Sequence, residues 1–253
     1  NNLNISNNGG TTFSVKTTSD GLASSNVFSV YASGSTVFAA TGAGLSQSTD
    51  GGNTFTTNTS LGNVSTYSIA VSGSNVYVTT PNGVAISTDN GVTFTTTNIG
   101  FVSSIAVSGA TVVAGDLGNG LYISTDGGSS FTNLTTADGL ATNVVNSVAV
   151  VGGAIYLALG DEIDFLTFNT TPGGVDIITD NGTTITHKTT ADGLGSSDVF
   201  GIQVLGTTVY AATRGGLSIS TDGGSSFTNY TTSNTTGFGA NYVQTVYVTS
   251  DKI

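Results

Sequence analysis

The chain has 253 residues, of which 8% are charged and 37% hydrophobic, and Thr, Ser, Asn and Gly together supply over half of the positions. Strong helix formers are scarce while β-branched and aromatic residues are plentiful, which predicts an all-β protein and excludes helical bundles and doubly wound α/β folds. The formal net charge is −11, and the four basic residues are scattered, which excludes nucleic acids and anionic membrane surfaces as partners.

Short apolar β runs follow one another along the whole chain, separated by Gly-, Ser- and Asn-rich turns. They predict about four short strands in every ~40 residues, the spacing typical of four-stranded propeller blades. The clearest predicted strands span 26–31, 36–41, 44–48, 54–57, 67–71, 75–80, 104–107, 111–114, 144–151, 154–159, 199–205 and 207–213.

One turn sequence recurs and sets the period of the chain. It reads STDGGNTF at 48–55 and returns at 87–94, 124–131 and 220–227, with weaker copies at 178–185 and 6–13. The key positions are 8, 50, 89, 126, 180 and 222, so that all intervals but one are 37 to 42 residues and the exception is 54. This predicts an all-β, six-bladed β-propeller of four-stranded antiparallel blades, with a parallel β-helix as the less favoured alternative.

The repeated turn resembles the Asp-box of the bacterial neuraminidase repeat (BNR), with Phe where that pattern has Trp. Its five aspartates are interpreted as structural, because a carboxylate in a tight loop accepts backbone N–H bonds while Gly takes the left-handed position. The four strands of a blade are lettered A to D in chain order. The resemblance also implies that these turns join strands C and D, away from the face that binds ligands. The structural aspartates are Asp50, Asp89, Asp126, Asp180 and Asp222.

A second element, TTSDGL or TTADGL, precedes the first strand of several repeats, at 17–22, 135–140 and 189–194. It resembles the linker of two-component-regulator-type bacterial propellers, and Asp20, Asp138 and Asp192 are expected to cap its turns. Together the two elements place the blades at about 23–60, 61–98, 99–137, 141–191 with an insertion at 160–173, 195–233, and 238–253 joined to 1–18.

Blade topology predicts where the remaining charged residues lie. The B–C turns and the linkers emerge at one end of each blade, opposite the Asp turns, and loops at that end are where propellers usually bind ligands. The insertion carries three carboxylates and two phenylalanines, which suit Ca²⁺ or, alternatively, stacking on a sugar ring. The candidate ligand-binding residues are Asp116, Asp161, Glu162, Asp164, Phe165, Phe168 and Arg214, and the candidate metal ligands are Asp161, Glu162 and Asp164.

No catalytic residue is assigned. Sialidases need an arginine triad and a Tyr–Glu nucleophile, but this chain has only Arg214 and Glu162. Asp-box xyloglucan hydrolases place paired aspartates in a Trp-rich cleft, and Trp is absent here, although a pair such as Asp116 with Asp161 stays open. His187, at the end of an outer strand, is interpreted as a surface residue.

The chain contains no cysteine, which rules out disulfides and thiolate metal sites. No apolar run approaches the ~20 residues that span a bilayer, and neither a signal peptide nor an initiator Met opens the sequence. We therefore expect a mature or excised extracellular piece, secreted or at the cell surface, that needs no cofactor.

The two ends of the chain align with complementary parts of one repeat. They are expected to build the sixth blade together, with its second strand cut short. Either residues outside this sequence or a neighbouring chain would complete it, and the second option predicts self-assembly into a fibre. The predicted function is a non-catalytic extracellular binding or structural module, with neighbouring copies, surface proteins or glycans as partners. The alternatives are a lectin-like propeller or an Asp-dependent glycoside hydrolase.

Overall fold

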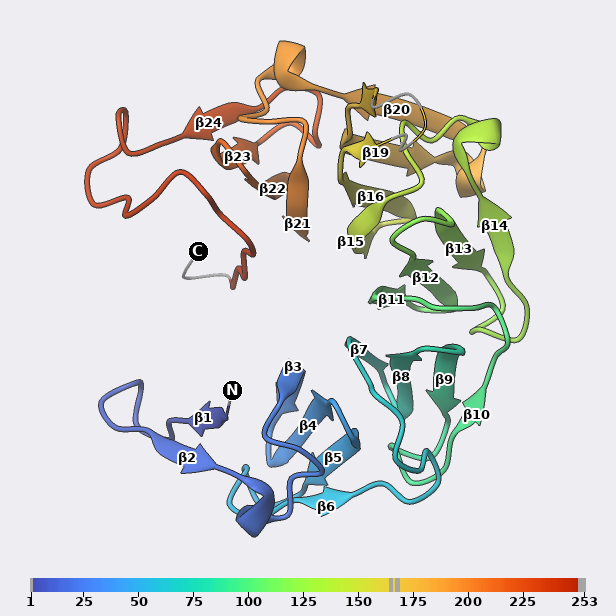
Figure 1. The fold of residues 1–253 in the computed structure, drawn as a ribbon, viewed down its shortest axis with the longest axis vertical. Coiled ribbons are helices and arrows are strands. Elements are labelled where there is room, and N and C mark those ends of the chain that lie inside the picture. Colours follow the sequence, from blue (N-terminus) through green and yellow to red (C-terminus); the bar gives the residue numbers. More distant parts are fainter. Residues whose placement is uncertain (1, 164–165, 167–168, 250–253) are drawn as a thin grey trace. The chain divides into compact units, whose positions relative to one another are not determined.

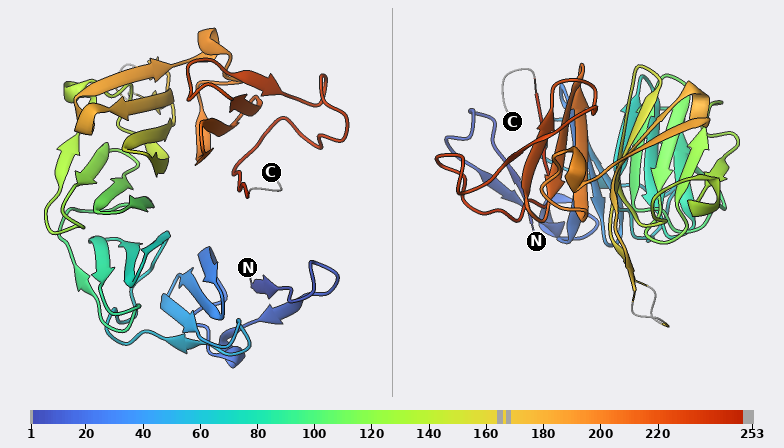
Figure 2. Two further views of the ribbon diagram at one scale, coloured as in Figure 1. Left: turned by 180° about the vertical axis from the view of Figure 1, so that it is seen from behind. Right: turned by 90° about the horizontal axis from the view of Figure 1, so that it is seen from above.

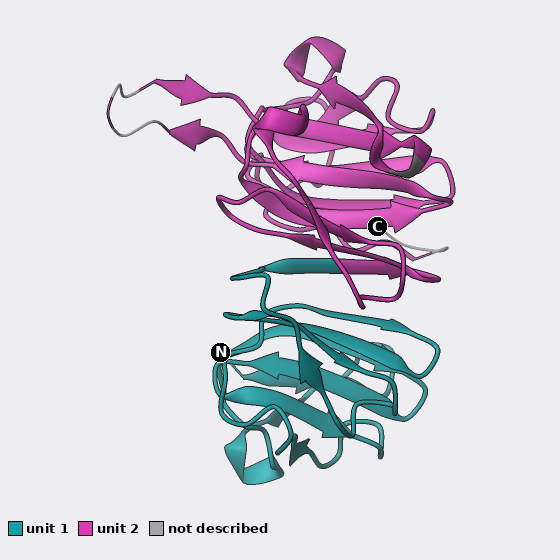
Figure 3. Ribbon diagram, turned by 90° about the vertical axis from the view of Figure 1, so that its right-hand side faces the viewer, with its two compact units in different colours: residues 1–105 teal, residues 106–253 magenta. Residues whose placement is uncertain are grey.

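A computed structural model describes residues 2–163, 166 and 169–249 of the chain. These residues form β-strands joined by turns and short 3₁₀ helices. The chain divides into two compact units, Asn1–Ile105 (unit 1) and Ala106–Ile253 (unit 2), which Figure 3 shows in different colours. Within the described part, no helix combines the length and the apolar character that a membrane crossing requires.

Unit 1 contains a hairpin and two four-stranded sheets, each antiparallel with its strands in chain order (Figure 1). The hairpin pairs β1 (Leu3–Ile5) with β2 (Ser14–Lys16), and the 3₁₀ helix η1 (Thr18–Asp20) follows it. The sheets consist of β3 (Val27–Ser33), β4 (Thr36–Thr41), β5 (Gly44–Ser48) and β6 (Thr56–Thr57), and of β7 (Ile69–Ser72), β8 (Asn75–Thr80), β9 (Gly83–Ser87) and β10 (Thr95–Thr96).

Three further four-stranded sheets follow, and the division between the units falls within the first strand of the first one, β11 (Ser104–Ser108). That sheet continues with β12 (Thr111–Gly115), β13 (Leu121–Ser124) and β14 (Thr132–Leu134). The next two consist of β15 (Val145–Val151), β16 (Ala154–Leu159), β19 (Gly174–Thr179) and β20 (Thr184–Lys188), and of β21 (Val199–Leu205), β22 (Thr208–Thr213), β23 (Gly216–Ser220) and β24 (Thr228–Tyr230). The connecting 3₁₀ helices are η2 (Thr136–Asp138), η3 (Asp180–Gly182) and η4 (Thr190–Asp192).

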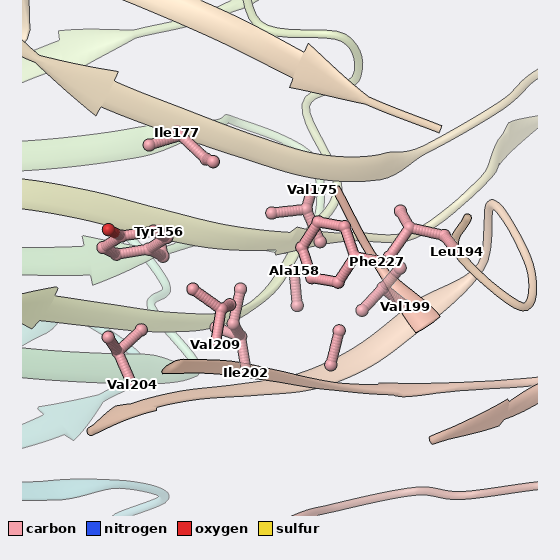
Figure 4. Close-up of a cluster of buried hydrophobic side chains, with 11 residues drawn as sticks. Tyr156, Ala158, Val175, Ile177, Leu194, Val199, Ile202, Val204, Val209 and Phe227 are labelled. Carbon is pink, nitrogen blue, oxygen red and sulfur yellow. The ribbon is translucent and has the colours of Figure 1, made fainter. Parts of the chain in front are cut away.

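The core of unit 2 lies between neighbouring sheets. Tyr156, Ala158 and Ile177 from one sheet contact Ile202 and Val209 from the next, and Figure 4 shows these side chains facing each other. The second strand of each four-stranded sheet is buried along almost its whole length, which explains why these strands are mostly apolar in the sequence. Burying each such Val, Leu or Ile side chain contributes about 1.5–3 kcal/mol before entropy losses.

The strands predicted at 36–41, 44–48, 75–80, 154–159 and 199–205 match β4, β5, β8, β16 and β21 at both ends. The 54-residue interval is explained by an inserted hairpin between β16 and β19, formed by β17 (Glu162–Ile163) and β18 (Thr170–Thr171). This hairpin extends beyond the end of its parent sheet (Figure 2).

The sixth repeat differs from the other five. Among the described residues, its N-terminal part forms only the hairpin β1–β2, while residues 241–248 contain no strand. Leu3 and Ile5 of the hairpin pack against Leu22 and Phe55 in unit 1. In unit 2, residues Val243–Val248 pack against Tyr210 and Leu217 through Val243, Val246 and Val248. A closed sixth blade therefore stays a prediction.

Candidate functional site

The repeated Asp turns use their polar groups internally. In the turn after β13, Ser124 Oγ donates to Asp126 Oδ1 over 2.7 Å, Ser130 N donates to the same oxygen over 2.9 Å, and Ser130 Oγ donates to Oδ2 over 2.6 Å. Gly128 N in turn donates to Ser124 Oγ. The turns of Asp50, Asp89 and Asp222 repeat this pattern. Such carboxylates hold a turn and have little capacity left for a ligand.

These hydrogen bonds lower the pKa of all four carboxyls, and the hydroxyl and N–H donors of Thr93 lower that of Asp89 to about 2. Because the folded-state pKa lies below the unfolded value of about 3.9, the turns stabilise the fold above that pH and lose this contribution as the pH falls. We expect the thermal midpoint to decrease from about pH 4 towards pH 2. Circular dichroism melts across this range measure it, Asp126→Asn should flatten the slope, and a constant midpoint would contradict the explanation.

The linker aspartates also act locally. Thr17 N donates to Asp20 Oδ2 over 2.9 Å, and Thr17 accepts from Ser19 N, so each linker is closed by a capping box around a 3₁₀ turn. Asp138 and Asp192 repeat this arrangement. The fifth Asp-turn residue, Asp180, differs from the other four Asp-turn residues: it adopts a left-handed φ of 52°, and its carboxylate accepts from Thr184 Oγ1.

Of the predicted binding residues, Asp116 is 3% exposed and caps its own turn. Its two carboxylate oxygens accept from Asn119 N over 2.9 Å and from Asn119 Nδ2 over 3.0 Å. At the base of the β17–β18 hairpin, Asp161 Oδ1 accepts from Gly173 N over 2.9 Å and Glu162 Oε2 accepts from Asn143 N over 3.2 Å. The predicted residues Asp164, Phe165 and Phe168 lie outside the described residues.

Asp198 joins two of the predicted residues into one group. Its Oδ2 lies 3.9 Å from Nη1 of Arg214, whose backbone N–H donates to the Asp198 carbonyl. Burial, and then the negative charge of Asp161, raise the pKa of the Asp198 carboxyl, while Arg214 and the Asp161 backbone N–H oppose the increase. We call Asp161, Asp198 and Arg214 the B–C-end cluster, because two of them lie in B–C turns and the third directly precedes β21.

Sequence reasoning did not select Asp198, although the repeat carries a signal. The segment SSDVF at 196–200 repeats SSNVF at 24–28, so Asp198 stands where the first repeat has Asn26. A carboxylate at a repeat position where the first repeat has a neutral amide is the sequence signal that points to Asp198.

A second group that the sequence did not reveal is the pair Asp176–His187. Asp176 on β19 is fully buried, and its Oδ1 lies 2.7 Å from Nδ1 of His187, on the adjacent strand β20. Its Oδ2 accepts from Ala141 N over 3.0 Å. His187 is one-third exposed, as its outer-strand position suggests, but its ring is tied to a buried carboxylate. Among the described residues, no group of three His, Cys, Asp or Glu is placed to hold a metal ion.

No family model and no curated protein sequence matches the chain. Solved structures do, and this chain spans about a third or less of the length of each of the following three. An ancestral GH74 enzyme matches with TM-score 0.68 and 19% identity over 82% of this chain and 32% of that one. The extracellular domain of a protein described as a hybrid two-component system of B. thetaiotaomicron matches with TM-score 0.64 and 16% identity over 83% and 30%. PorZ, a surface component of the type-IX secretion system of Porphyromonas gingivalis, matches with TM-score 0.57 and 14% identity over 87% and 27%.

These likenesses support a β-propeller fold, in agreement with the succession of four-stranded antiparallel sheets. At these identities they carry the fold alone, so that the chemistry of this chain has to be argued from its own residues.

Proposed function

We propose that this chain is a non-catalytic binding module of a secreted or cell-surface protein, built as a six-bladed propeller with Asp-box-like turns. Six copies of the turn sequence support the blade number. The extracellular setting is supported by the low charge and by two of the similar structures, of which one is an extracellular domain and the other a bacterial surface component.

The observation that carries the proposal is that the carboxylates at the two ends of the sheets differ in how fully their oxygens are hydrogen-bonded within the protein. Four Asp turns are saturated by their own Ser, Thr and backbone donors, so they act in the fold. In the B–C-end cluster, Asp198 is instead desolvated beside Asp161 and meets the Arg214 guanidinium only at 3.9 Å. The side chain of Arg214 is 67% exposed, so its donors remain available to hydroxyl or carboxylate oxygens of a ligand.

We therefore expect a glycan or surface-protein ligand to bind at this cluster. A glycan array tests whether the ligand is a glycan. The affinity of any glycan that binds is then measured by titration for the wild type and for the variants Asp198→Asn and Arg214→Ala. Each variant should weaken binding at least tenfold, which corresponds to about 1.4 kcal/mol. Lys16→Ala, which removes a cation from unit 1, serves as the control. Equal affinities of wild type and both variants would contradict the assignment of the site.

The main alternative is an Asp-dependent glycoside hydrolase. The mutual proximity of Asp161 and Asp198, and the raised pKa of Asp198, are the observations that favour it. Asp116 does not support it, because its carboxylate is occupied by Asn119. Release of reducing ends from polysaccharides by the wild type, lost in Asp198→Asn, would replace the binding proposal. Ca²⁺ binding at the insertion and self-assembly through the sixth repeat stay predictions.

A further inference from the structure

Unit 1 contains a cavity of about 330 Å³ between its two four-stranded sheets, at the end that carries the Asp turns. No residue of the B–C-end cluster lines this cavity, so the two proposed binding sites can be tested independently of each other. Its lining includes two aromatic rings and several uncharged polar side chains: Tyr31, Thr36, Phe38, Gln47, Thr49 and Asn90.

The cavity exists where the chain departs from its own repeat. Gln47 on β5 pairs with Phe38 on β4. In each of the other four-stranded sheets, the third strand carries isoleucine at the position that corresponds to Gln47: Ile86, Ile123, Ile177 and Ile219. The registers of these pairs are equivalent, because the residue after Gln47 and after each isoleucine is the first residue of the turn sequence, a serine in every case except Ile178 after Ile177.

The isoleucine normally fills the space beneath the next turn. Cδ1 of Ile177 lies directly against the position that a Cβ of Gly224 would take, in the turn of the following sheet. In unit 1 the equivalent glycine is Gly91, where the ring of Phe38 lies 2.7 Å from the Cβ position and Gln47 Oε1 lies 3.7 Å away. The Phe38 ring therefore takes the place beneath this turn that Ile177 takes beneath the turn of Gly224, and the polar amide of Gln47 lies beside it.

Two more departures meet at the same cavity. Tyr31 stands where two of the corresponding cross-strand rows have alanine, Ala70 and Ala149, and a third has Gln203, so the aromatic ring at this position is specific to the first four-stranded sheet among these rows. Asn90 adopts a left-handed φ of 60° where three other turns use glycine, namely Gly51, Gly127 and Gly223. Asparagine adopts this conformation more readily than other non-glycine residues, so the turn keeps its shape while a polar side chain is added to the lining of the cavity.

The polar side chains of the cavity are largely unused within the protein. Gln47 Nε2 donates to the Asn90 carbonyl over 3.2 Å. In the part of the chain that the structure describes, no hydrogen bond is found for the side chains of Tyr31, Thr36 or Thr49. Phe38 is 2% exposed and forms an apolar floor. Hydroxyl and amide groups around an aromatic floor suit a ligand that is apolar on one face and polar at its edge.

We propose that this cavity binds a single neutral sugar ring. No charged side chain lines it, so neither a carboxylate nor a phosphate on the ligand would be neutralised. Its volume lies at the small end of the range for ligand pockets, which favours one ring over an oligomer. The ring's C–H face packs against Tyr31, above the floor that the buried Phe38 forms, while its hydroxyls exchange hydrogen bonds with Gln47 and Thr49.

Saturation-transfer NMR with glucose, galactose, mannose and N-acetylglucosamine tests the proposal, followed by titration of any sugar that binds. Gln47→Ile restores the residue of the other repeats and removes the amide that would hydrogen-bond the sugar, so it should abolish transfer or weaken affinity at least tenfold while the thermal midpoint is kept or raised. Tyr31→Ala should weaken binding to a similar extent. Thr221→Ala, at the position that matches Thr49 in the sheet β21–β24, is the control and should bind as the wild type does.

Two results would overturn the proposal: no transfer to any of the four sugars at 10 mM concentration, or undiminished binding by Gln47→Ile. If the free monosaccharide and a glycan ending in the same sugar bind with equal affinity, the site holds one terminal ring, as proposed. Affinity that rises by more than tenfold with the longer glycan would place the site elsewhere. Loss of glycan binding in Arg214→Ala, with the Gln47→Ile effect absent, would support only the B–C-end cluster.

Discussion

Asp176→Ala should lower the free energy of unfolding of unit 2 by about 2 kcal/mol. The carboxylate is fully buried and accepts from the Ala141 N–H and from His187. Alanine leaves both donors without a partner, and a buried N–H that loses its acceptor costs about 1–3 kcal/mol. Far-UV circular dichroism or tyrosine fluorescence in urea measures the change, since the chain has nine Tyr and no Trp.

A double variant that copies the equivalent residue pair of another sheet tests whether Asp176→Ala destabilises through lost hydrogen bonds or through lost side-chain volume. In the sheet β21–β24 the equivalent pair is Ser218 and Asn229, where Ser218 Oγ accepts from Gly195 N over 2.9 Å and donates to Asn229 Oδ1 over 3.1 Å. Asp176→Ser combined with His187→Asn recreates this network. It should recover most of the stability that Asp176→Ala loses, and a double variant as unstable as the alanine variant would refute the hydrogen-bond account.

The sequence predicts the strands and turns well because the repeated turns are stabilised by hydrogen bonds between residues that are close in the sequence. A Gly-Gly pair after Ser-Thr-Asp closes the same turn wherever it occurs, and Asp126 is held by residues at most four positions away. The DGL linkers likewise form capping boxes from three neighbouring residues. Local interactions of this kind need no knowledge of the tertiary structure.

The site residues were harder to predict because they depend on contacts across strands and sheets. His187 meets Asp176 only through the register of β19 and β20, and Asp198 meets Asp161 only across the boundary between two sheets. Gln47 is unremarkable in the sequence until the cross-strand rows show that isoleucine occupies its position elsewhere. Of the residues chosen from sequence, Asp161 and Arg214 are brought together by Asp198, whereas Asp116 only caps its own turn.

Gly193→Ala should destabilise unit 2 by at least about 3 kcal/mol. Gly193 closes the linker turn with a φ of 99°, and a Cβ there would overlap the carbonyl oxygen of Phe227. That backbone segment is fixed, because Phe227 N donates to the Asp192 carbonyl over 2.8 Å and the Phe227 ring packs in the core with Leu194. The clash is therefore with main chain that cannot move without opening the core.

Gly139 provides the matched control, since it closes the same turn in the preceding linker with a φ of 108°. A Cβ at Gly139 would meet only Cδ1 of Ile185, at 3.7 Å, which is ordinary contact. Gly139→Ala should then cost only the backbone strain of a left-handed alanine, about 1–2 kcal/mol. Urea unfolding of the two variants compares the costs directly, and equal losses would show that strain alone, without the Phe227 carbonyl, requires glycine in these linkers.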